Sequence, residues 1–183
     1  MNTSGTLEAP GPLNDARTQE SDPFESMEGV ARAMTGGHVG RARLGRLGES
    51  YVALWLQSQG WRIMARNWQC RFGELDLVAL DPDQVLAFVE VKTRRSTTFG
   101  PPEEAVGPAK RTRLRRTAVR WLIACNLDPG CRHKGTRFDV VTLMVGRPDR
   151  EGLSGRIPLA DGRAPGRGWP TEALFIRQIK GAF

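Results

Sequence analysis

Two strand-like runs separated by a short turn constrain the fold of this 183-residue chain more than any other feature. The first run covers residues 74–80, and the second covers residues 85–93, which are rich in Val and Phe. Residues 81–84 read Asp-Pro-Asp-Gln, a composition typical of a turn. Because β-branched and aromatic residues favour strands, we predict that the two runs pair as an antiparallel hairpin.

The segments around this hairpin predict a mixed α/β fold. Apolar residues recur every three or four positions in residues 41–59 and on one face of residues 108–125, which is typical of amphipathic helices. Further strands are expected at residues 61–67, 137–145 and 173–179. The order is an α-β-β-β-α-β core with a last strand, so we predict a mixed sheet flanked by helices. A crossover through the second helix would make the third and fourth strands parallel.

The composition divides the chain into an N-terminal arm and one domain. Residues 1–38 mix Pro, Gly, Ser, Thr and acids around few large apolar residues, so they bury too little surface to offset the entropy of ordering. We therefore predict a disordered arm at residues 1–38 and a single domain at residues 39–183. The Gly- and Pro-rich stretch at about 146–170 is expected to be a flexible loop within that domain.

Hydropathy and cysteine usage favour a cytoplasmic protein. No apolar run approaches the roughly 18 residues of a membrane span, and the start of the chain lacks the basic and apolar regions of a secretory signal. Cys70, Cys125 and Cys131 are too few and too unevenly spaced for a disulfide framework or a zinc site. We expect buried or incidental thiols in a reducing compartment, and no membrane partner.

The charge pattern favours nucleic acid as the partner. The net charge is +7, and residues 110–120 hold five Arg and one Lys without an acid. Ribosomal neighbours or an anionic membrane surface would attract the same charge, and a solvated helix face is the alternative for residues 110–120. The residues expected to contact nucleic acid are Arg71, Arg94, Arg95, Lys110 and Arg113.

Two acids and a lysine are expected to converge on one face of the predicted hairpin. Strand alternation places Asp76 on the same face as Glu90 and Lys92 if the two strands pair tightly. Two carboxylates suit a hard divalent cation, Mg²⁺ or Mn²⁺, and Lys92 is suited to orient water or to stabilise a pentavalent phosphoryl transition state. Glu49 on the first helix would complete the set, as a ligand or through a metal-bound water. A charged pair on a solvent-exposed strand face is the alternative for Glu90 and Lys92.

These residues follow the pattern of a known superfamily: an acid on an N-terminal helix, an Asp in a hairpin strand and then Glu-x-Lys. Glu49, Asp76 and Glu90-Val91-Lys92 thereby resemble the PD-(D/E)XK nucleases, with Leu75 where the literal motif has Pro. From about residue 40 to residue 183 the chain is similar to the bacterial YraN family, through residues 66–68, 71–77, 88–94 and 137–141.

The resemblance implies a restriction endonuclease-like fold and an activity. YraN proteins are similar to archaeal Holliday junction resolvases, which implies a metal-dependent endonuclease that cleaves DNA, including branched or junction DNA, and a homodimer. It also implies that Glu49, Asp76, Glu90 and Lys92 are catalytic and that the first three bind the metal. Two alternatives are a catalytically silent nuclease-like module that binds nucleic acid and a subunit that a partner protein activates.

Two further acids have competing interpretations. Glu74 shares a face with Asp76, so it is either a supporting carboxylate of the same site, or an ordinary surface acid or a partner of Arg71. For Asp139, in the strand expected at residues 137–145, we favour a structural partner of an Arg over a metal ligand.

Overall fold

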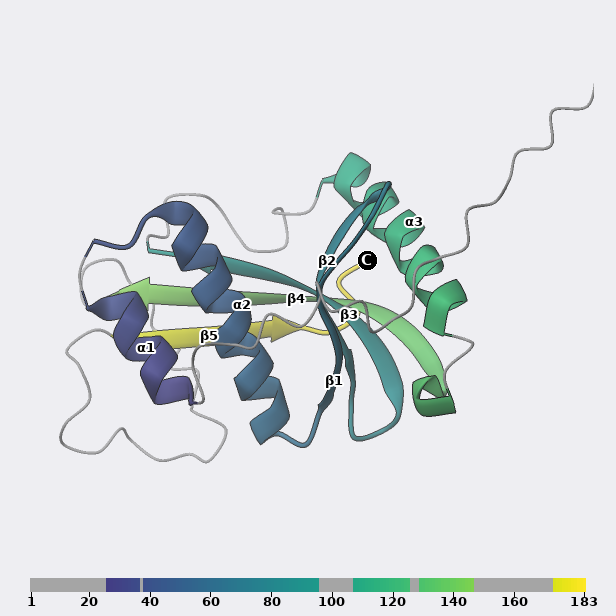
Figure 1. Cartoon of the computed structure of the whole chain (residues 1–183), viewed down its shortest axis with the longest axis horizontal. Coiled ribbons are helices and arrows are strands. Elements are labelled where there is room, and N and C mark those ends of the chain that lie inside the picture. The colour runs from purple at the N-terminus through teal and green to yellow at the C-terminus, as the bar shows by residue number, and fades with distance from the viewer. Residues whose placement is uncertain (1–25, 37, 96–106, 126–128, 147–172) are drawn as a thin grey trace, which may run out of the picture.

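The computed structural model describes residues 26–36, 38–95, 107–125, 129–146 and 173–183 (Figure 1). Its helices are α1 (Met27–Thr35), α2 (Arg41–Ser58), α3 (Pro108–Cys125) and the short 3-10 helix η2 (Pro129–Cys131). Its strands are β1 (Arg62–Cys70), β2 (Gly73–Leu80), β3 (Val85–Arg94), β4 (Gly135–Gly146) and β5 (Ala173–Ile179).

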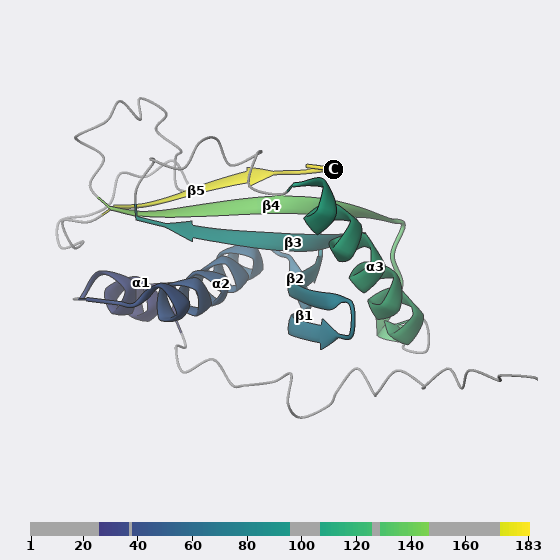
Figure 2. The ribbon, with the colours of Figure 1, turned by 90° about the horizontal axis from the view of Figure 1, so that it is seen from above.

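The strands form one mixed sheet in the order β1-β2-β3-β4-β5. Strand β3 runs parallel to β4, and the other neighbouring pairs are antiparallel. The predicted hairpin, the predicted parallel pair and the predicted mixed α/β architecture are therefore confirmed. Strand β3 connects to β4 through α3, which is the crossover expected for parallel neighbours. The sheet is seen nearly edge-on in Figure 2.

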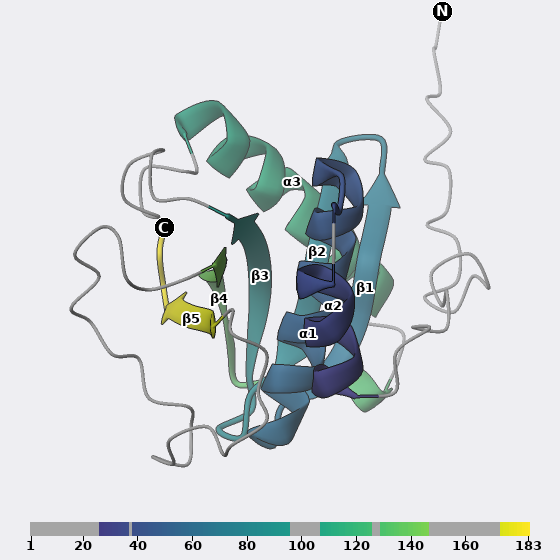
Figure 3. The same ribbon diagram turned by 90° about the vertical axis from the view of Figure 1, so that its left-hand side faces the viewer.

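Apolar side chains form two layers, one on each face of the sheet. On one face, α1 and α2 pack against alternate strand residues such as Leu77, Val89 and Val141. On the other face, α3 packs against Val78 and Phe88. Figure 3 shows α1 and α2 together in front of the β1–β2 hairpin, with α3 beyond it. Because successive side chains of a strand point to opposite faces of the sheet, the same strands contribute apolar residues to both layers.

The prediction of a disordered arm is wrong for residues 27–35, which form α1. Ser26 caps this helix, because its Oγ accepts a hydrogen bond of 3.2 Å from the Gly29 N–H. Val30 and Met34 are fully buried against α2. The arm's Gly and acids masked this short apolar stripe in the sequence. Residues 1–25 and the predicted loop at 147–170 lie outside the described ranges.

Most other boundaries agree with the sequence within a few residues. Strand β1 was expected to end at residue 67 but continues to Cys70, because the turn to β2 contains only Arg71 and Phe72. Gly73 follows with φ +144°, a backbone conformation that favours glycine. A Cβ at Gly73 would lie 3.0 Å from Arg113 Cδ, so this turn packs closely on α3.

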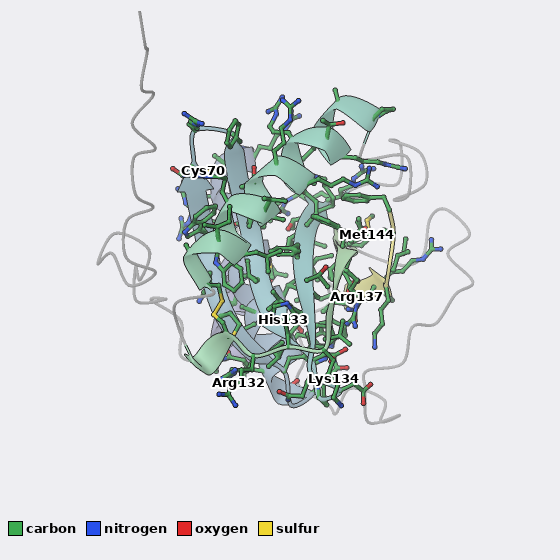
Figure 4. The ribbon with its side chains drawn as sticks, turned by 90° about the vertical axis from the view of Figure 1, so that its right-hand side faces the viewer. Cys70, Arg132, His133, Lys134, Arg137 and Met144 are labelled. Atoms are coloured by element: carbon green, nitrogen blue, oxygen red, sulfur yellow. A yellow bond between two sulfur atoms is a disulfide. The ribbon has the colours of Figure 1, made fainter. Side chains whose placement is uncertain are left out.

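The expectation of three thiols is wrong for two cysteines. Cys125 ends α3, and η2 brings Cys131 back beside it, with a Cα–Cα distance of 5.8 Å and a disulfide between them. Cys70 is a free thiol. Figure 4 shows the disulfide far from Cys70, which lies near the β1–β2 turn. None of the helices in the described ranges is long and apolar enough to cross a membrane.

Candidate active site

The candidate site lies where β2 separates from β3. Strand β2 pairs with β3 only from Leu77 to Leu80, whereas its pairing with β1 continues to Gly73. Extending the β2–β3 register by one residue places Asp76 opposite Glu90. Figure 1 shows the β1–β2 hairpin bending away from β3 towards α3 at this point. The separation leaves side chains of two strands accessible to both helical layers.

Asp76 is held on the backbone of the neighbouring strand. Its Oδ2 accepts a hydrogen bond of 2.8 Å from the Val91 N–H of β3. Burial, followed by the negative charges of Glu90 and Glu49, raises the pKa of Asp76 to about 7, against the lowering effects of the Val91 hydrogen bond and the charge of Lys92. Such a pKa shows that the protein places this carboxyl among other carboxylates without full compensation.

Glu90 is a buried carboxylate that two lysines neutralise. Its side chain is 5% exposed, and its Oε1 accepts ion-paired hydrogen bonds from Lys92 and from Lys110. Lys92 comes from the same strand, whereas Lys110 comes from the first turn of α3. Burial alone would lower the pKa of Lys110, but the ion pair with Glu90 outweighs that effect and the pKa is raised. Lys110 therefore stays an ammonium.

Glu49 approaches the two strands from α2. The helix is pressed against β3 at Gly48, where an added Cβ would lie 1.7 Å from Thr93 Oγ1 and 2.8 Å from Thr93 Cβ. Burial raises the pKa of Glu49, as do the charges of Glu74 and Glu90. The side chain is thus within electrostatic range of the Asp76–Glu90 pair, although it lies on the other helical layer.

Two residues of β1 support Glu49, and sequence reasoning did not identify them. A hydrogen bond from the Asn67 side chain and the charge of Arg66 both act to lower the pKa of Glu49. Arg66 also donates to Ser50 Oγ at 2.9 Å, which ties β1 to α2. Asn67 has φ +48°, a left-handed conformation that is uncommon outside glycine. This left-handed conformation beside the half-buried Glu49 marks Asn67 as a functional candidate, and the sequence alone does not reveal it.

A pocket of about 420 Å³ opens between the β1–β2 turn and α3. Asp76 and Glu90 contribute carboxylates to its wall, and Lys110 and Arg113 contribute cations from α3. The remaining lining residues are Gln69, Cys70, Gly73, Glu74 and Leu114. Glu49 and Lys92 are not part of this lining, so they meet the carboxylate pair from outside the pocket. Glu74 lines the pocket, but it is exposed, as an ordinary surface acid would be. Gln69 donates to Glu74 at 3.4 Å, and no bond from Arg71 to Glu74 is seen among the described residues.

The predicted nucleic-acid contacts fall into three places. Lys110 and Arg113 line the pocket beside the carboxylates. Arg71 lies at the β1–β2 turn, with its guanidinium 4.8 Å from the centre of the Phe72 ring. Arg94 is at the end of β3, and the next residue, Arg95, donates to the Met34 carbonyl oxygen at 2.7 Å. The structure thus brings only the α3 pair of these five residues to the carboxylates.

The predicted three-carboxylate metal set is not assembled as a compact group. Within the part of the chain that the structure describes, no three His, Cys, Asp or Glu side chains are close enough to hold a metal ion together. Asp76 and Glu90 are the two predicted ligands that face each other across the strands. Glu49 and this pair influence one another electrostatically.

A second acidic cluster lies on the same sheet, and its carboxylates, Asp139 and Asp81, accept hydrogen bonds, although Arg137 Nη2 is buried without a partner in the described part of the chain. Asp139 on β4 is completely buried and accepts from Arg137 Nε at 3.0 and 3.1 Å, from Gln178 Nε2 at 2.9 Å and from the Gly181 N–H at 3.0 Å. Arg137, labelled in Figure 4, also bonds Asp81 Oδ2 at 2.6 Å. The interpretation of Asp139 as a structural partner of an Arg is therefore confirmed.

Comparisons with known proteins match the part of the chain that holds the site. The family model of Uncharacterised protein family UPF0102 matches residues 48–143. A UPF0102 protein of Bifidobacterium longum (strain NCC 2705) is 50% identical over 109 residues, which cover 58% of this chain and 86% of that protein. UPF0102 proteins of Mycolicibacterium gilvum (47% identical, covering 58% of this chain and 85% of the relative) and Myxococcus xanthus (44%, covering 60% and 82%) are also similar.

Proposed function

We propose, from the premise that this chain belongs to the UPF0102 (YraN) family of the restriction endonuclease-like superfamily, that it is a metal-dependent endonuclease that hydrolyses phosphodiester bonds in DNA. One observation carries the proposal. The half-buried Asp76 and the buried Glu90 line one pocket, two lysines pair with Glu90, and the pKa of Asp76 is raised to about 7. Strong perturbation of this kind is typical of functional sites.

The carboxylate pair suits a divalent cation. Mg²⁺ is usually held by one or two carboxylates together with waters and substrate phosphates, so a third protein carboxylate is not required. Asp76 and Glu90 would hold Mg²⁺ or Mn²⁺, with Glu49 acting through a water. A bound cation of this class supplies Lewis-acid polarisation of the phosphoryl group and a more acidic water.

The chain's own residues supply orientation and charge. The Val91 N–H holds one oxygen of Asp76, so the direction of this carboxylate is set by the backbone of β3. Lys92 carries a positive charge beside Glu90 and is positioned to stabilise charge that develops on phosphoryl oxygens. Arg113 and Lys110 line the same pocket and are suited to contact the phosphate backbone. Phosphate contacts of this kind position nucleic acid without reading its sequence.

Cleavage of a DNA panel tests the proposal. Branched, flapped, duplex and single-stranded substrates are incubated with purified protein and Mg²⁺ or Mn²⁺. We expect metal-dependent cleavage that falls by at least about 10²–10³-fold in Asp76→Asn and in Glu90→Gln, which keep the side-chain shape. Glu28→Gln is the matched control, because Glu28 lies on α1 with its side chain 75% exposed. Equal activity in wild type and both site variants would contradict the assignment.

A silent nucleic-acid-binding module is the second candidate. The observation in its favour is that two lysines already neutralise Glu90. Calorimetric titration with Mn²⁺ separates the candidates: DNA binding without metal binding supports the silent module, whereas metal binding without turnover supports a subunit activated by a partner.

The branched substrate and the homodimer remain predictions from the family resemblance, and sedimentation with and without junction DNA tests both.

A further inference from the structure

We propose that Lys110 is an exchangeable counter-ion: it neutralises Glu90 when no divalent cation is bound, and it binds a phosphate of the substrate when one is. The inference rests on the proposed function, because it assumes that a cation binds at Asp76 and Glu90. It adds a residue on α3 to the site and a coupling between metal binding and DNA binding.

The two lysines on Glu90 differ in how they are attached. Both donate to the same carboxylate oxygen, Oε1. Lys92 is two residues from Glu90 on the same strand, with its side chain 24% exposed. Lys110 comes from a different element, with its side chain 41% exposed, and it also lines the pocket. Lys110 is therefore the ammonium that can leave Glu90 and remain within the site.

Helix α3 does not need to move for this exchange. Leu114 and Trp121 are buried against the sheet, and the stem of Arg113 packs on Gly73. The first turn of α3 is thereby held against the β1–β2 turn. A lysine side chain has a flexible four-carbon stem, and its ammonium carries three hydrogen-bond donors. Rotation of the Lys110 side chain alone can therefore redirect its ammonium.

The charges of the pocket determine what the Lys110 ammonium binds after it leaves Glu90. Glu74, Asp76 and Glu90 line the pocket together with Lys110 and Arg113, so acids outnumber cations there. A phosphate entering this pocket without a divalent cation meets uncompensated carboxylates and a lysine already paired with Glu90. A cation at the carboxylate pair would release Lys110, which then stands beside Arg113 as a second donor to a phosphodiester. Metal and phosphate would each increase affinity for the other, because such coupling is reciprocal.

Metal titration of a Lys110 variant tests the exchange without any requirement for catalysis. Mn²⁺ is titrated by calorimetry into wild type, Lys110→Met and Lys134→Met, each without DNA. Lys134 is an exposed lysine just before β4, so its replacement controls for the loss of one positive charge. We expect Lys110→Met to bind Mn²⁺ at least about fivefold more tightly than both other proteins, the lower end of typical coupling between sites.

A second titration measures the coupling itself. A phosphorothioate oligonucleotide, which keeps the backbone charge and resists hydrolysis, is titrated with and without Mn²⁺. In wild type, Mn²⁺ should tighten oligonucleotide binding by about fivefold or more, and in Lys110→Met this ratio should fall towards one. Lys110→Arg keeps a cation at the position and should restore competition with Mn²⁺.

The outcomes separate this inference from the proposed function. Equal or weaker Mn²⁺ binding in Lys110→Met, with binding abolished in Asp76→Asn, would overturn the exchange and leave the metal site standing. Absence of Mn²⁺ binding in wild type and Lys110→Met would overturn both. Tighter Mn²⁺ binding in Lys110→Met without DNA cleavage by wild type would support the exchange and count against the nuclease.

Discussion

Two acidic clusters on one sheet show opposite electrostatics. Asp76 lies in β2 with its pKa raised to about 7 by burial and by neighbouring carboxylates. Asp81 follows the same strand, and although burial acts to raise its pKa, hydrogen bonds from Val85 and Arg137 lower the pKa overall. The difference teaches that a cluster whose carboxylates have hydrogen-bond donors and an Arg partner stabilises the fold. A cluster with incomplete partners retains repulsion that a cation can relieve.

The largest expected effect concerns stability and the Asp139 cluster. Asp139→Ala leaves the half-buried Arg137 guanidinium without its Asp139 ion pair, so we expect a loss of about 3–5 kcal/mol in the free energy of unfolding. Asp76→Asn should cost little or increase stability, because it removes a charge that the fold disfavours. Urea denaturation at pH 7 compares the two variants. Equal losses would remove the distinction between the clusters.

Divalent cations should stabilise the protein through only one of the clusters. At a free Mn²⁺ concentration of about 100 times its Kd, mass action adds about 2.7 kcal/mol to the free energy of unfolding of wild type. The gain should vanish in Asp76→Asn, whereas Asp81→Asn should retain it. Thermal unfolding with and without Mn²⁺ measures both. A gain that depends on Asp81 would reverse the assignment of the clusters.

The position of α2 offers a further test of the Asp76–Glu90 cluster, because this helix brings Glu49 to the site. Gly48→Ala forces a Cβ against the Thr93 Cβ, 2.8 Å away, which rotation cannot relieve. We expect a loss of about 1–3 kcal/mol from overpacking and reduced DNA cleavage as Glu49 is displaced. Gly45→Ala is the matched control on the same helix, since nothing lies within 4 Å of its added Cβ. It should gain about 0.5–1 kcal/mol and leave cleavage unchanged.

The smallest expected effect is a pH dependence of the structural cluster. The pKa of Asp81 in the folded protein lies below its ordinary value of 3.8, so its contribution to stability is present above that pH. The contribution is lost as pH falls below 3.8 through the folded pKa, because the unfolded carboxyl has the higher pKa and binds the proton more tightly than the folded carboxyl does. Asp81→Asn should therefore flatten this acid limb in urea titrations between pH 5 and about pH 2. An unchanged limb would show that Asp81 is not coupled to Arg137.

Some site residues could be predicted because strand alternation is a local property. Asp76 and Glu90 were placed on one face from a period of two, and the register puts Asp76 opposite Glu90. The ion pair between Lys110 and Glu90 could not be predicted, because it joins an α3 residue to a strand residue through packing. The same limitation hid the Cys125–Cys131 disulfide, which depends on how η2 turns after α3.

By itself, the sequence determined the order of the elements from α2 onward, the parallel β3–β4 pair and the convergence of Asp76, Glu90 and Lys92. Periodicity encodes which face of a strand a side chain occupies, so these features need no distant contacts. Only the tertiary structure decided that β2 leaves β3 at Leu77, that Lys110 neutralises Glu90 and that Gln178 and the Gly181 N–H also donate to Asp139. These outcomes depend on burial and on partners from other elements, and those determine whether an acid stabilises the fold or remains available to a cation.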